Sequence, residues 1–208
     1  MSFLCEVFAP DEVGATPVAP HAAISADERV LLTALRPDVP LAIWLRDVPK
    51  GWEAMLAPVL ARAPFTAIAE AKPDIAVERL AEKLPLAVPV ELLADIYRLG
   101  TLFAAMTGHD QVRLRLEAVT GDACKRFHVD AVGYRMLCTY AGAGTEWCMG
   151  DPELCQVSRA PLCGVAMFRG RRLAGAHCLH RSPPLTRTKE GPRLLLCCDE
   201  PGVFKHDA

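Results

Sequence analysis

The sequence lacks several features that would assign it to a particular class of protein. No apolar run reaches the roughly 18 residues that a membrane-spanning helix needs, and no basic segment precedes an apolar stretch near the first residue, as a secretory signal would require. Neither sign of charge dominates, because 23 Lys and Arg residues stand against 25 Asp and Glu residues. A nucleic-acid binder that relies on overall charge is therefore not indicated. We expect a cytoplasmic protein whose partners are neither a membrane nor a nucleic acid.

The spacing of cysteines and glycines argues against two further kinds of site. Eight of the nine cysteines lie after residue 108, yet no C-x-x-C pair occurs, so a zinc knuckle is poorly supported. The odd number of cysteines and the missing secretory signal argue against a framework of disulfides, and we expect reduced thiols. The sequence also contains no glycine-rich loop of the phosphate-binding kind.

Length and composition indicate one globular domain preceded by an arm. The chain has 208 residues, of which 51% are hydrophobic and 23% are charged, as in an ordinary folded domain. Residues 1–24 are rich in Pro, Ala and Gly without periodicity, and we expect an extended or poorly ordered arm there. Residues 25–208 are predicted to form a single domain.

Residues 25–108 are predicted to be mainly helical and to buttress a sheet. Ser25 and Glu28 have the spacing of a capping box, and the helix that they begin should stop at Pro37. Apolar residues at three- and four-residue spacing predict the strongest helix over about 90–107, with Gly108 as its end. Shorter segments are a helix at about 52–62, another at 74–83 and a buried strand at 40–46.

From residue 109 onward the apolar period changes to two. Gln111–Val119 alternates apolar and charged side chains, as a half-buried strand does. Further strands are predicted at 126–130, 134–140, 163–169 and 193–198, separated by glycines and by prolines. Short strands with turns between them favour a sandwich, a jelly roll or a barrel. The predicted fold class is therefore α+β, with a β core over residues 109–208.

Three residues have types and an order that suit a metal site. In His128-Val129-Asp130 the imidazole and the carboxylate would project from the same face of a strand. His180, delivered by a later strand, would complete a set of two histidines and one carboxylate. Such a set leaves open positions on a six-coordinate ion, the usual arrangement in non-haem Fe(II) oxygenases. His177 is a rival ligand, although it would point elsewhere on a strand.

An arginine near the end of the chain could bind a cosubstrate. Arg193 follows His180 by thirteen residues and begins a predicted strand. The planar fork of its guanidinium would suit the far carboxylate of 2-oxoglutarate, the keto acid that many ferrous oxygenases use. Arg181 and Arg187 are alternatives for this role, and Arg181 could instead contact substrate.

A second group of side chains could line the pocket. Thr145 and Trp147 would supply a hydrogen-bonding wall and an apolar wall, or else a turn and a core indole. Tyr134 or Tyr140 could donate a hydrogen bond to a bound keto acid, although aromatic side chains in sheets need no such role. Cys178 would share a strand face with the histidine two residues later, and a thiolate at the metal would favour zinc over iron.

Four segments within roughly residues 90–200 together resemble the bacterial family catalogued as domain of unknown function 1826. The segments are Cys124-Lys125-Arg126-Phe127-His128-Val129-Asp130, Arg135-Met136-Leu137-Cys138-Thr139-Tyr140, Gly142-Ala143-Gly144-Thr145-Glu146-Trp147 and His180-Arg181-Ser182-Pro183-Pro184. Members of that family often lie beside genes of zinc homeostasis. The resemblance therefore implies a link to metal supply, without implying a reaction.

More distantly, the order of these residues is similar to that in prolyl-hydroxylase-like oxygenases. There the H-x-D motif is followed by a strand ending in Tyr, a glycine turn with Thr, a glycine–apolar–Phe strand, the second His and a basic residue. The corresponding residues here are Tyr140, Gly142, Gly144, Thr145, Gly164–Phe168, His180 and Arg193. This similarity implies a double-stranded β-helix, that is, a jelly-roll or cupin-like core, with Tyr140 and Arg193 beside 2-oxoglutarate.

The sequence thus predicts an oxygenase-like protein that binds Fe(II) through His128, Asp130 and His180. The alternative is a non-catalytic protein of metal homeostasis that binds zinc at the same three residues, with one of the thiols. A third hypothesis is an interaction module on a cupin-like scaffold, which would bind no metal. The substrate is not identified by the sequence.

Overall fold

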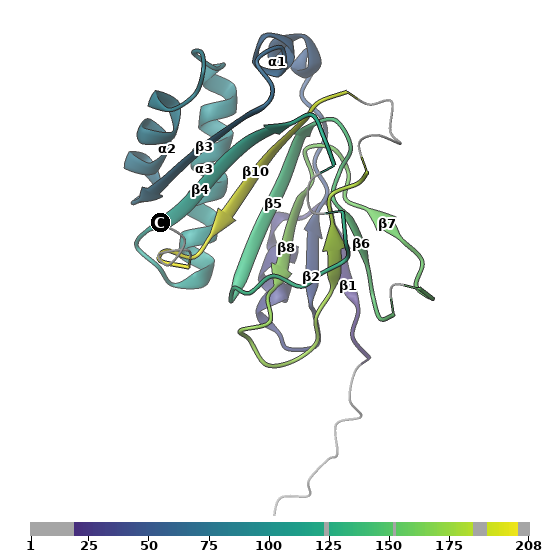
Figure 1. Cartoon of the computed structure of the whole chain (residues 1–208). Coiled ribbons are helices and arrows are strands. Elements are labelled where there is room, and N and C mark those ends of the chain that lie inside the picture. Colours follow the sequence, from purple (N-terminus) through teal and green to yellow (C-terminus); the bar gives the residue numbers. More distant parts are fainter. Residues whose placement is uncertain (1–18, 123–124, 152, 185–190, 204–208) are drawn as a thin grey trace, which may run out of the picture.

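The computed structural model describes residues 19–122, 125–151, 153–184 and 191–203 (Figure 1). The helices within this part of the chain are the 3-10 helix η1 (Glu28–Leu35), α1 (Trp52–Leu60), α2 (Pro73–Glu82) and α3 (Val90–Thr107). The strands are β1 (Ala22–Ser25), β2 (Leu41–Trp44), β3 (Phe65–Ala71), β4 (Val112–Val119), β5 (Tyr134–Ala141), β6 (Glu146–Cys148), β7 (Ser158–Arg159), β8 (Val165–Arg169), β9 (Leu179–Arg181) and β10 (Arg193–Asp199).

The strands form one large sheet and one small sheet. The large sheet has the order β1-β2-β8-β5-β10-β4-β3, and the small sheet has the order β7-β6-β9. Among the described strands, β1 and β2 run parallel, and the other neighbouring pairs run antiparallel. The late strand β10 lies between β5 and β4, so a segment near the end of the chain occupies the interior of the sheet.

Different elements cover the two faces of the large sheet. The helices α2 and α3 lie beside β3 and β4, away from β6 and β7 (Figure 1). Successive residues of a strand point to opposite faces, so Met136 and Cys138 enter the larger core on the helical face. Leu137 instead enters a smaller core, where Phe168 of the large sheet meets Cys178, which directly precedes β9. The small sheet therefore packs on the face opposite the helices.

Several predicted elements are found where the sequence places them. The long helix α3 covers residues 90–107 and ends at Gly108, whose φ of +71° suits a glycine. The predicted helices at 52–62 and 74–83 correspond to α1 and α2. The predicted strands at 40–46, 111–119, 134–140, 163–169 and 193–198 correspond to β2, β4, β5, β8 and β10. These are the segments whose periodicity is longest or whose apolar run is most sharply bounded.

The first predicted helix starts later than expected. Ser25 ends β1 instead of capping a helix, and its Oγ accepts a hydrogen bond from the N–H of Asp27 (3.0 Å). Asp27 is the N-cap of η1, because its carboxylate accepts from the N–H of Arg29 (2.9 Å). The residue that turns the chain into a helix is thus two positions further along.

The sheets extend beyond the β core that was predicted over residues 109–208, and of the strands from the first half the sequence predicts only the one at 40–46. The strands β1, β2 and β3 come from the first half, and β1 begins inside the segment assigned to the arm, of which residues 1–18 lie outside the described residues. The predicted strand at 126–130 is replaced by an isolated bridge from His128 to His180. No described helix combines the length and apolarity needed to cross a bilayer.

Candidate metal centre

Two histidines and one aspartate from separate segments meet in the structure. His180 lies in β9, whereas His128 and Asp130 lie in the connection between β4 and β5. One potential ligand atom from each residue lies within 4.8 Å of the other two. The structure thus brings together the three residues that the sequence singles out as metal ligands.

A backbone bridge and an aromatic ring position the two imidazoles. The N–H of His128 donates to the carbonyl of His180 (3.1 Å), and the N–H of His180 donates back (3.0 Å). The ring centroids of these histidines are 4.7 Å apart, and the ring of Phe168 in β8 lies 4.4 Å from that of His180. The side chain of His180 is 6% exposed and that of His128 is 38% exposed. Packing therefore fixes one imidazole, while the other borders solvent.

The donor atoms fit a divalent cation. Nδ1 of His128 lies 2.9 Å from the carbonyl oxygen of Arg126; a proton on Nδ1 that donates there leaves the lone pair on Nε2. That Nε2 is 3.5 Å from Asp130 Oδ1, and Nε2 of His180 is 2.9 Å from Asp130 Oδ2. The buried Oδ2 nevertheless receives no well-oriented hydrogen bond from a described residue. A carboxylate oxygen without a donor, facing imidazole nitrogens, suits a metal ion between them.

Asp130 is ionised in spite of its burial. Burial alone would raise its pKa, but the imidazoles of His128 and His180 and the guanidinium of Arg135 hold the pKa far below its ordinary value. The contact with Asp130 in turn raises the pKa of His128. The cluster therefore presents an anionic oxygen to whatever it binds.

A second carboxylate anchors the arginine that contacts Asp130. Nη1 of Arg135 in β5 donates to Asp130 Oδ1 (2.5 Å), while its Nε and Nη2 donate to the two carboxylate oxygens of Asp199 (2.6 and 3.1 Å). Asp199 lies in β10 and is fully buried. The sequence gives no signal that joins Arg135 to Asp199, because only the pairing of β5 with β10 brings them together.

Arg193 lines the same cleft as His180. It is 2% exposed and donates to Ser182 Oγ (2.9 Å), Thr145 Oγ1 (2.6 Å) and Thr139 Oγ1 (3.3 Å). Ser182 follows His180 by two residues, a separation of roughly 6–7 Å along an extended chain. The hydrogen bond to Ser182 thus joins the guanidinium of Arg193 to the segment that directly follows β9, the strand of His180.

A single cleft connects these groups. Its volume is about 120 Å³, and His128, His180, Arg193, Thr145 and Arg181 are among the residues that line it. Nε of Arg181 donates to Glu146 Oε2 (2.8 Å), and its guanidinium stacks over the ring of Phe127 (4.3 Å). Two of the expected pocket residues, Thr145 and Arg181, thus belong to the cleft.

Two other expected pocket residues face the core between the sheets. Trp147 packs against the smaller core, and its indole N–H finds no acceptor among the described residues. Cys178 is buried in the same core, where its Sγ donates to the carbonyl of Cys148 (3.4 Å), and burial raises its pKa to about 12. The structure therefore does not bring a thiolate to the metal ligands at this position.

The two tyrosines lie on the helical face of the large sheet, away from the cleft. The hydroxyl of Tyr140 donates to Asp95 of α3 (2.8 Å), and the hydroxyl of Tyr134 accepts from Arg169 (3.2 Å). Tyr140 therefore does not lie beside Arg193, contrary to expectation. Thr139, the preceding residue of β5, points to the other face and contacts Arg193 instead.

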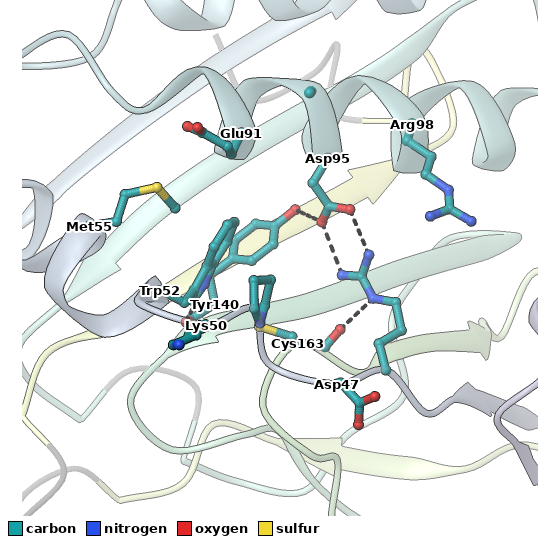
Figure 2. A pocket seen from close by; sticks show the side chains of 12 residues that line it. Asp47, Lys50, Trp52, Met55, Glu91, Asp95, Arg98, Tyr140 and Cys163 are labelled. Carbon is teal, nitrogen blue, oxygen red and sulfur yellow. Dashed lines mark hydrogen bonds and ion pairs between the residues drawn. The ribbon is translucent and has the colours of Figure 1, made fainter.

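A larger pocket lies on this helical face and is lined by neither His128 nor His180 (Figure 2). It has a volume of about 690 Å³ and lies between α1, α3 and the segment after β2. Two charged residues that line this pocket, Arg46 and Asp95, form an ion pair. Arg46 donates to both oxygens of Asp95 (2.6 and 3.0 Å), and Nε of Arg46 donates to the carbonyl of Cys163 (2.7 Å). These contacts join α3 to the large sheet, whereas the histidines line the smaller cleft.

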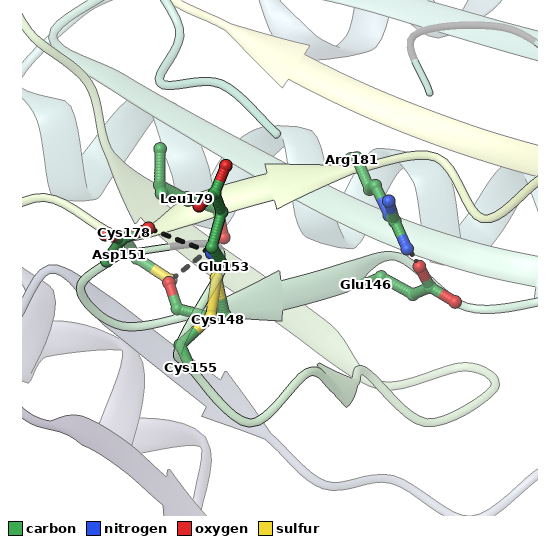
Figure 3. Close-up of a disulfide and its surroundings, with 8 residues drawn as sticks. All are labelled: Glu146, Cys148, Asp151, Glu153, Cys155, Cys178, Leu179 and Arg181. Carbon is green, nitrogen blue, oxygen red and sulfur yellow. Dashed lines mark hydrogen bonds and ion pairs between the residues drawn. A yellow bond between two sulfur atoms is a disulfide. The ribbon is translucent and has the colours of Figure 1, made fainter. Parts of the chain in front are cut away.

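One disulfide contradicts the expectation that all cysteines are reduced. Cys148, at the end of β6, is bonded to Cys155, and their Cα atoms are 6.0 Å apart (Figure 3). Because β7 pairs antiparallel with β6, the chain between them folds back and carries Cys155 beside Cys148. The other described cysteines, which are Cys138, Cys163, Cys178, Cys197 and Cys198, are free and buried.

Of two rival residues weighed from the sequence, one does not join the cluster and the other is not described. His177 is not among the described residues that could share a metal ion with His128, Asp130 and His180. Arg187, the alternative to Arg193, lies outside the described residues.

Comparison with solved structures relates the fold to that of oxygenases. The chain is similar to dioxygenase for auxin oxidation 1 from Arabidopsis thaliana in complex with 2-oxoglutarate, with 11% identity, 88% of this chain and 92% of that chain covered, and a TM-score of 0.52. It is also similar to a candidate oxygenase from Shewanella oneidensis, with 10% identity, coverage of 86% and 89%, and a TM-score of 0.51. A prolyl-4-hydroxylase from Pseudomonas putida gives 13% identity, coverage of 82% and 96%, and a TM-score of 0.47. At these identities the likeness shows the fold alone.

The sequence itself places the chain in one family. The family model described as "Protein of unknown function (DUF1826)" matches residues 25–199. The chain belongs to this family, as the four segments noted in the sequence indicate. No curated protein sequence gives a significant match.

Proposed function

We propose that the chain is a non-haem Fe(II)- and 2-oxoglutarate-dependent oxygenase whose two sheets form a double-stranded β-helix. The observation that carries this proposal is that one cleft holds His128, His180 and Arg193, with Asp130 beside the imidazoles. The fold shared with solved oxygenases, one of them in complex with 2-oxoglutarate, supports the proposal.

The residues of the cleft would have separate tasks. His128, Asp130 and His180 would hold the metal from one side and leave positions open on the other. Arg193 would bind the far carboxylate of the keto acid, with its guanidinium oriented by the hydroxyl of Ser182. Bound Fe(II) would supply the oxidation of a substrate C–H bond by O2, coupled to the oxidative decarboxylation of 2-oxoglutarate to succinate and CO2.

Metal content and the response to 2-oxoglutarate test the proposal. Full-length protein is purified without oxygen, and its metals are measured. We expect iron, with an absorption spectrum that changes when 2-oxoglutarate is added. His128→Ala and His180→Ala should each lose most of the bound iron. Unchanged metal content in both variants would overturn the metal site.

The cosubstrate site is tested by a matched pair of arginine variants. Arg193→Gln should keep its iron but bind 2-oxoglutarate at least tenfold more weakly, because a charged hydrogen-bonding partner is lost. Arg169→Gln is the control: Arg169 is buried like Arg193, but it donates to the main-chain carbonyls of Ala34 and Ala174. Equal loss of 2-oxoglutarate binding in both variants would contradict the role of Arg193.

The same measurements distinguish the alternative function. Tightly bound zinc that does not respond to 2-oxoglutarate would support a non-catalytic protein of metal homeostasis. Among the described residues no thiolate joins the histidines and the aspartate, so the donor set does not favour zinc over iron. Iron that responds to the keto acid would exclude this alternative.

A further inference from the structure

The two oxygens of the Asp130 carboxylate have different surroundings. Oδ1 accepts a charge-assisted hydrogen bond from Nη1 of Arg135 (2.5 Å). Oδ2 is buried, receives no well-oriented hydrogen bond from a described residue and lies 2.9 Å from Nε2 of His180. Oδ1 is therefore occupied by a cation of the protein, with Nε2 of His128 at the longer distance of 3.5 Å. Oδ2 faces Nε2 of His180 and has no such cation.

Arg135 cannot easily move away from this contact. It lies in β5 with 9% exposure, and two of its nitrogens are engaged by the fully buried carboxylate of Asp199. Cys197 Sγ donates to Asp199 (3.4 Å), and Arg113 lies 3.7 Å from the same carboxylate. A guanidinium that is anchored through two nitrogens presents the third in a fixed direction.

A neighbouring strand of the large sheet, β8, contacts the imidazole of His180. Arg135 in β5 is directly opposite Phe168 in β8, and Phe168 packs against the ring of His180 (4.4 Å). The large sheet therefore presents a cation to the carboxylate and an aromatic ring to the histidine from adjacent positions. Both ligands are oriented by one rigid surface.

We propose that Arg135 is a positioning residue that occupies Oδ1 of Asp130 and leaves Oδ2 as the ligand atom, so that the carboxylate binds the metal through one oxygen. This inference rests on the metal site of the proposed function. A carboxylate with both oxygens free can chelate a metal, whereas at an oxygen that accepts a short bond from an anchored guanidinium the metal must compete with that bond. Arg135 thereby keeps open a coordination position that the keto acid needs.

Removal of the Arg135 guanidinium should change how the metal is coordinated without releasing the metal. In Arg135→Gln, Oδ1 is released and can bind the metal beside Oδ2, so the metal is retained while one open position is lost. Arg135→Lys keeps the positive charge but offers a single point donor in place of the fork. It should fall between the wild-type protein and Arg135→Gln.

Cobalt(II) alone is a suitable probe, because its visible absorption reports the number and arrangement of its ligands. Full-length protein freed of metal is titrated with cobalt(II), and 2-oxoglutarate is then added. For Arg135→Gln we expect cobalt affinity within about fivefold of wild type, an altered cobalt spectrum and at least tenfold weaker binding of 2-oxoglutarate. Arg169→Gln, an equally buried arginine away from the cleft, should match the wild type in all three measurements.

The possible outcomes separate this inference from the proposed function. Wild-type spectra and 2-oxoglutarate affinity in Arg135→Gln would overturn the role of Arg135 and leave the oxygenase proposal intact. If wild-type protein takes up no cobalt, the proposed metal site itself fails. If Arg135→Gln does not fold, Arg135→Lys and Asp199→Asn provide the test. A wild-type cobalt spectrum in both of these would show that the arginine only stabilises the fold, and would overturn the inference.

Discussion

At the scale of single residues, His128 and Asp130 link stability to pH before any metal binds. Their contact raises the pKa of His128. A group whose pKa is raised on folding stabilises the fold below its unfolded pKa, here about 6.5, and loses that contribution as the pH rises through the raised value. The pKa of Asp130 is lowered, so its contribution is present above its unfolded value of about 3.9 and is lost as the pH falls through the lowered value.

We predict that the metal-free protein loses some stability as the pH rises from about 6 to about 8, and that His128→Gln removes this loss. The side chain of His128 is 38% exposed, so solvent screens the pair and the fall in Tm should be only a few degrees. Thermal unfolding in the presence of a chelator, at a series of pH values, measures the effect. The same pH dependence in His128→Gln would contradict it.

The buried thiols give a second prediction at this scale. Burial raises the pKa of Cys163 to about 11 and the pKa values of Cys178 and Cys197 to about 12. At pH 8 their thiolate fractions are therefore about one part in a thousand or less. We predict that all three escape iodoacetamide in the folded protein and react after unfolding, as measured by peptide mass spectrometry. Rapid labelling of Cys178 in the native protein would contradict its burial between the sheets.

Residue types alone identify the candidate ligands but not the groups that support them. His128, Asp130 and His180 could be selected because two imidazoles and a carboxylate in that order suit a metal. Thr139 could not be preferred to Tyr140, because the interior of β5 is buried on both faces. Such a strand has no alternation of polar and apolar residues to show which face a given side chain takes.

At the scale of elements, one carboxylate joins α3 to the large sheet. Asp95 accepts two hydrogen bonds from Arg46 and one from Tyr140. We predict that Asp95→Ala lowers the free energy of unfolding by about 2–4 kcal/mol, because it leaves a mostly buried guanidinium without its charge partner. Tyr140→Phe should cost about 1 kcal/mol. Urea unfolding measures both, and the metal content of both variants should be unchanged. Loss of metal in Tyr140→Phe would show that the helical face affects the cleft.

At one position of the turn before β6, only glycine fits without a clash. A Cβ on Gly144 would lie 1.9 Å from the carbonyl oxygen of Ala160, so Gly144→Ala must displace the turn and with it Thr145, a partner of Arg193. We predict a loss of about 1–3 kcal/mol in stability and weaker binding of 2-oxoglutarate by iron-loaded protein. Gly121→Ala is the control, because a Cβ there meets nothing within 4 Å. Calorimetric titration compares the two, and equal affinities would contradict the link from the turn to Arg193.

Element length and composition explain which elements the sequence could predict. The apolar period of α3 repeats over 18 residues, which suffices to define both its type and its end. The strands β1 and β9 have four and three residues, too few to show a period. In β3 the buried positions are alanines, and because alanine favours helices, the alternation carries little information about a strand. Because its strands are so short, the small sheet, which positions His180, was not predictable from the sequence.

At the scale of the whole molecule, the proposed metal site connects the two sheets. His180 belongs to the small sheet, whereas Asp130 is held through Arg135 to β5 and β10 of the large one. The three strands of the small sheet have only three, two and three residues. Its backbone hydrogen bonds are correspondingly few, so a link to the large sheet should matter more to it than to the helices.

Metal binding should consequently stabilise one part of the molecule more than the rest. A ligand that binds only the folded state adds about 2.7 kcal/mol to the free energy of unfolding at a hundredfold excess over its Kd. This increase slows hydrogen exchange at every amide that exchanges by global unfolding. Amides of β6 and β9 should exchange by local opening, which a metal bridging the sheets would suppress directly. We predict that hydrogen exchange, compared with and without Fe(II) under anaerobic conditions, slows most at β6 and β9 and that His180→Ala abolishes this difference. If amide exchange slowed equally in α3 and β9, the metal would act on global stability alone. The small sheet would then be held by its packing against Phe168 and Leu137, without help from the metal site.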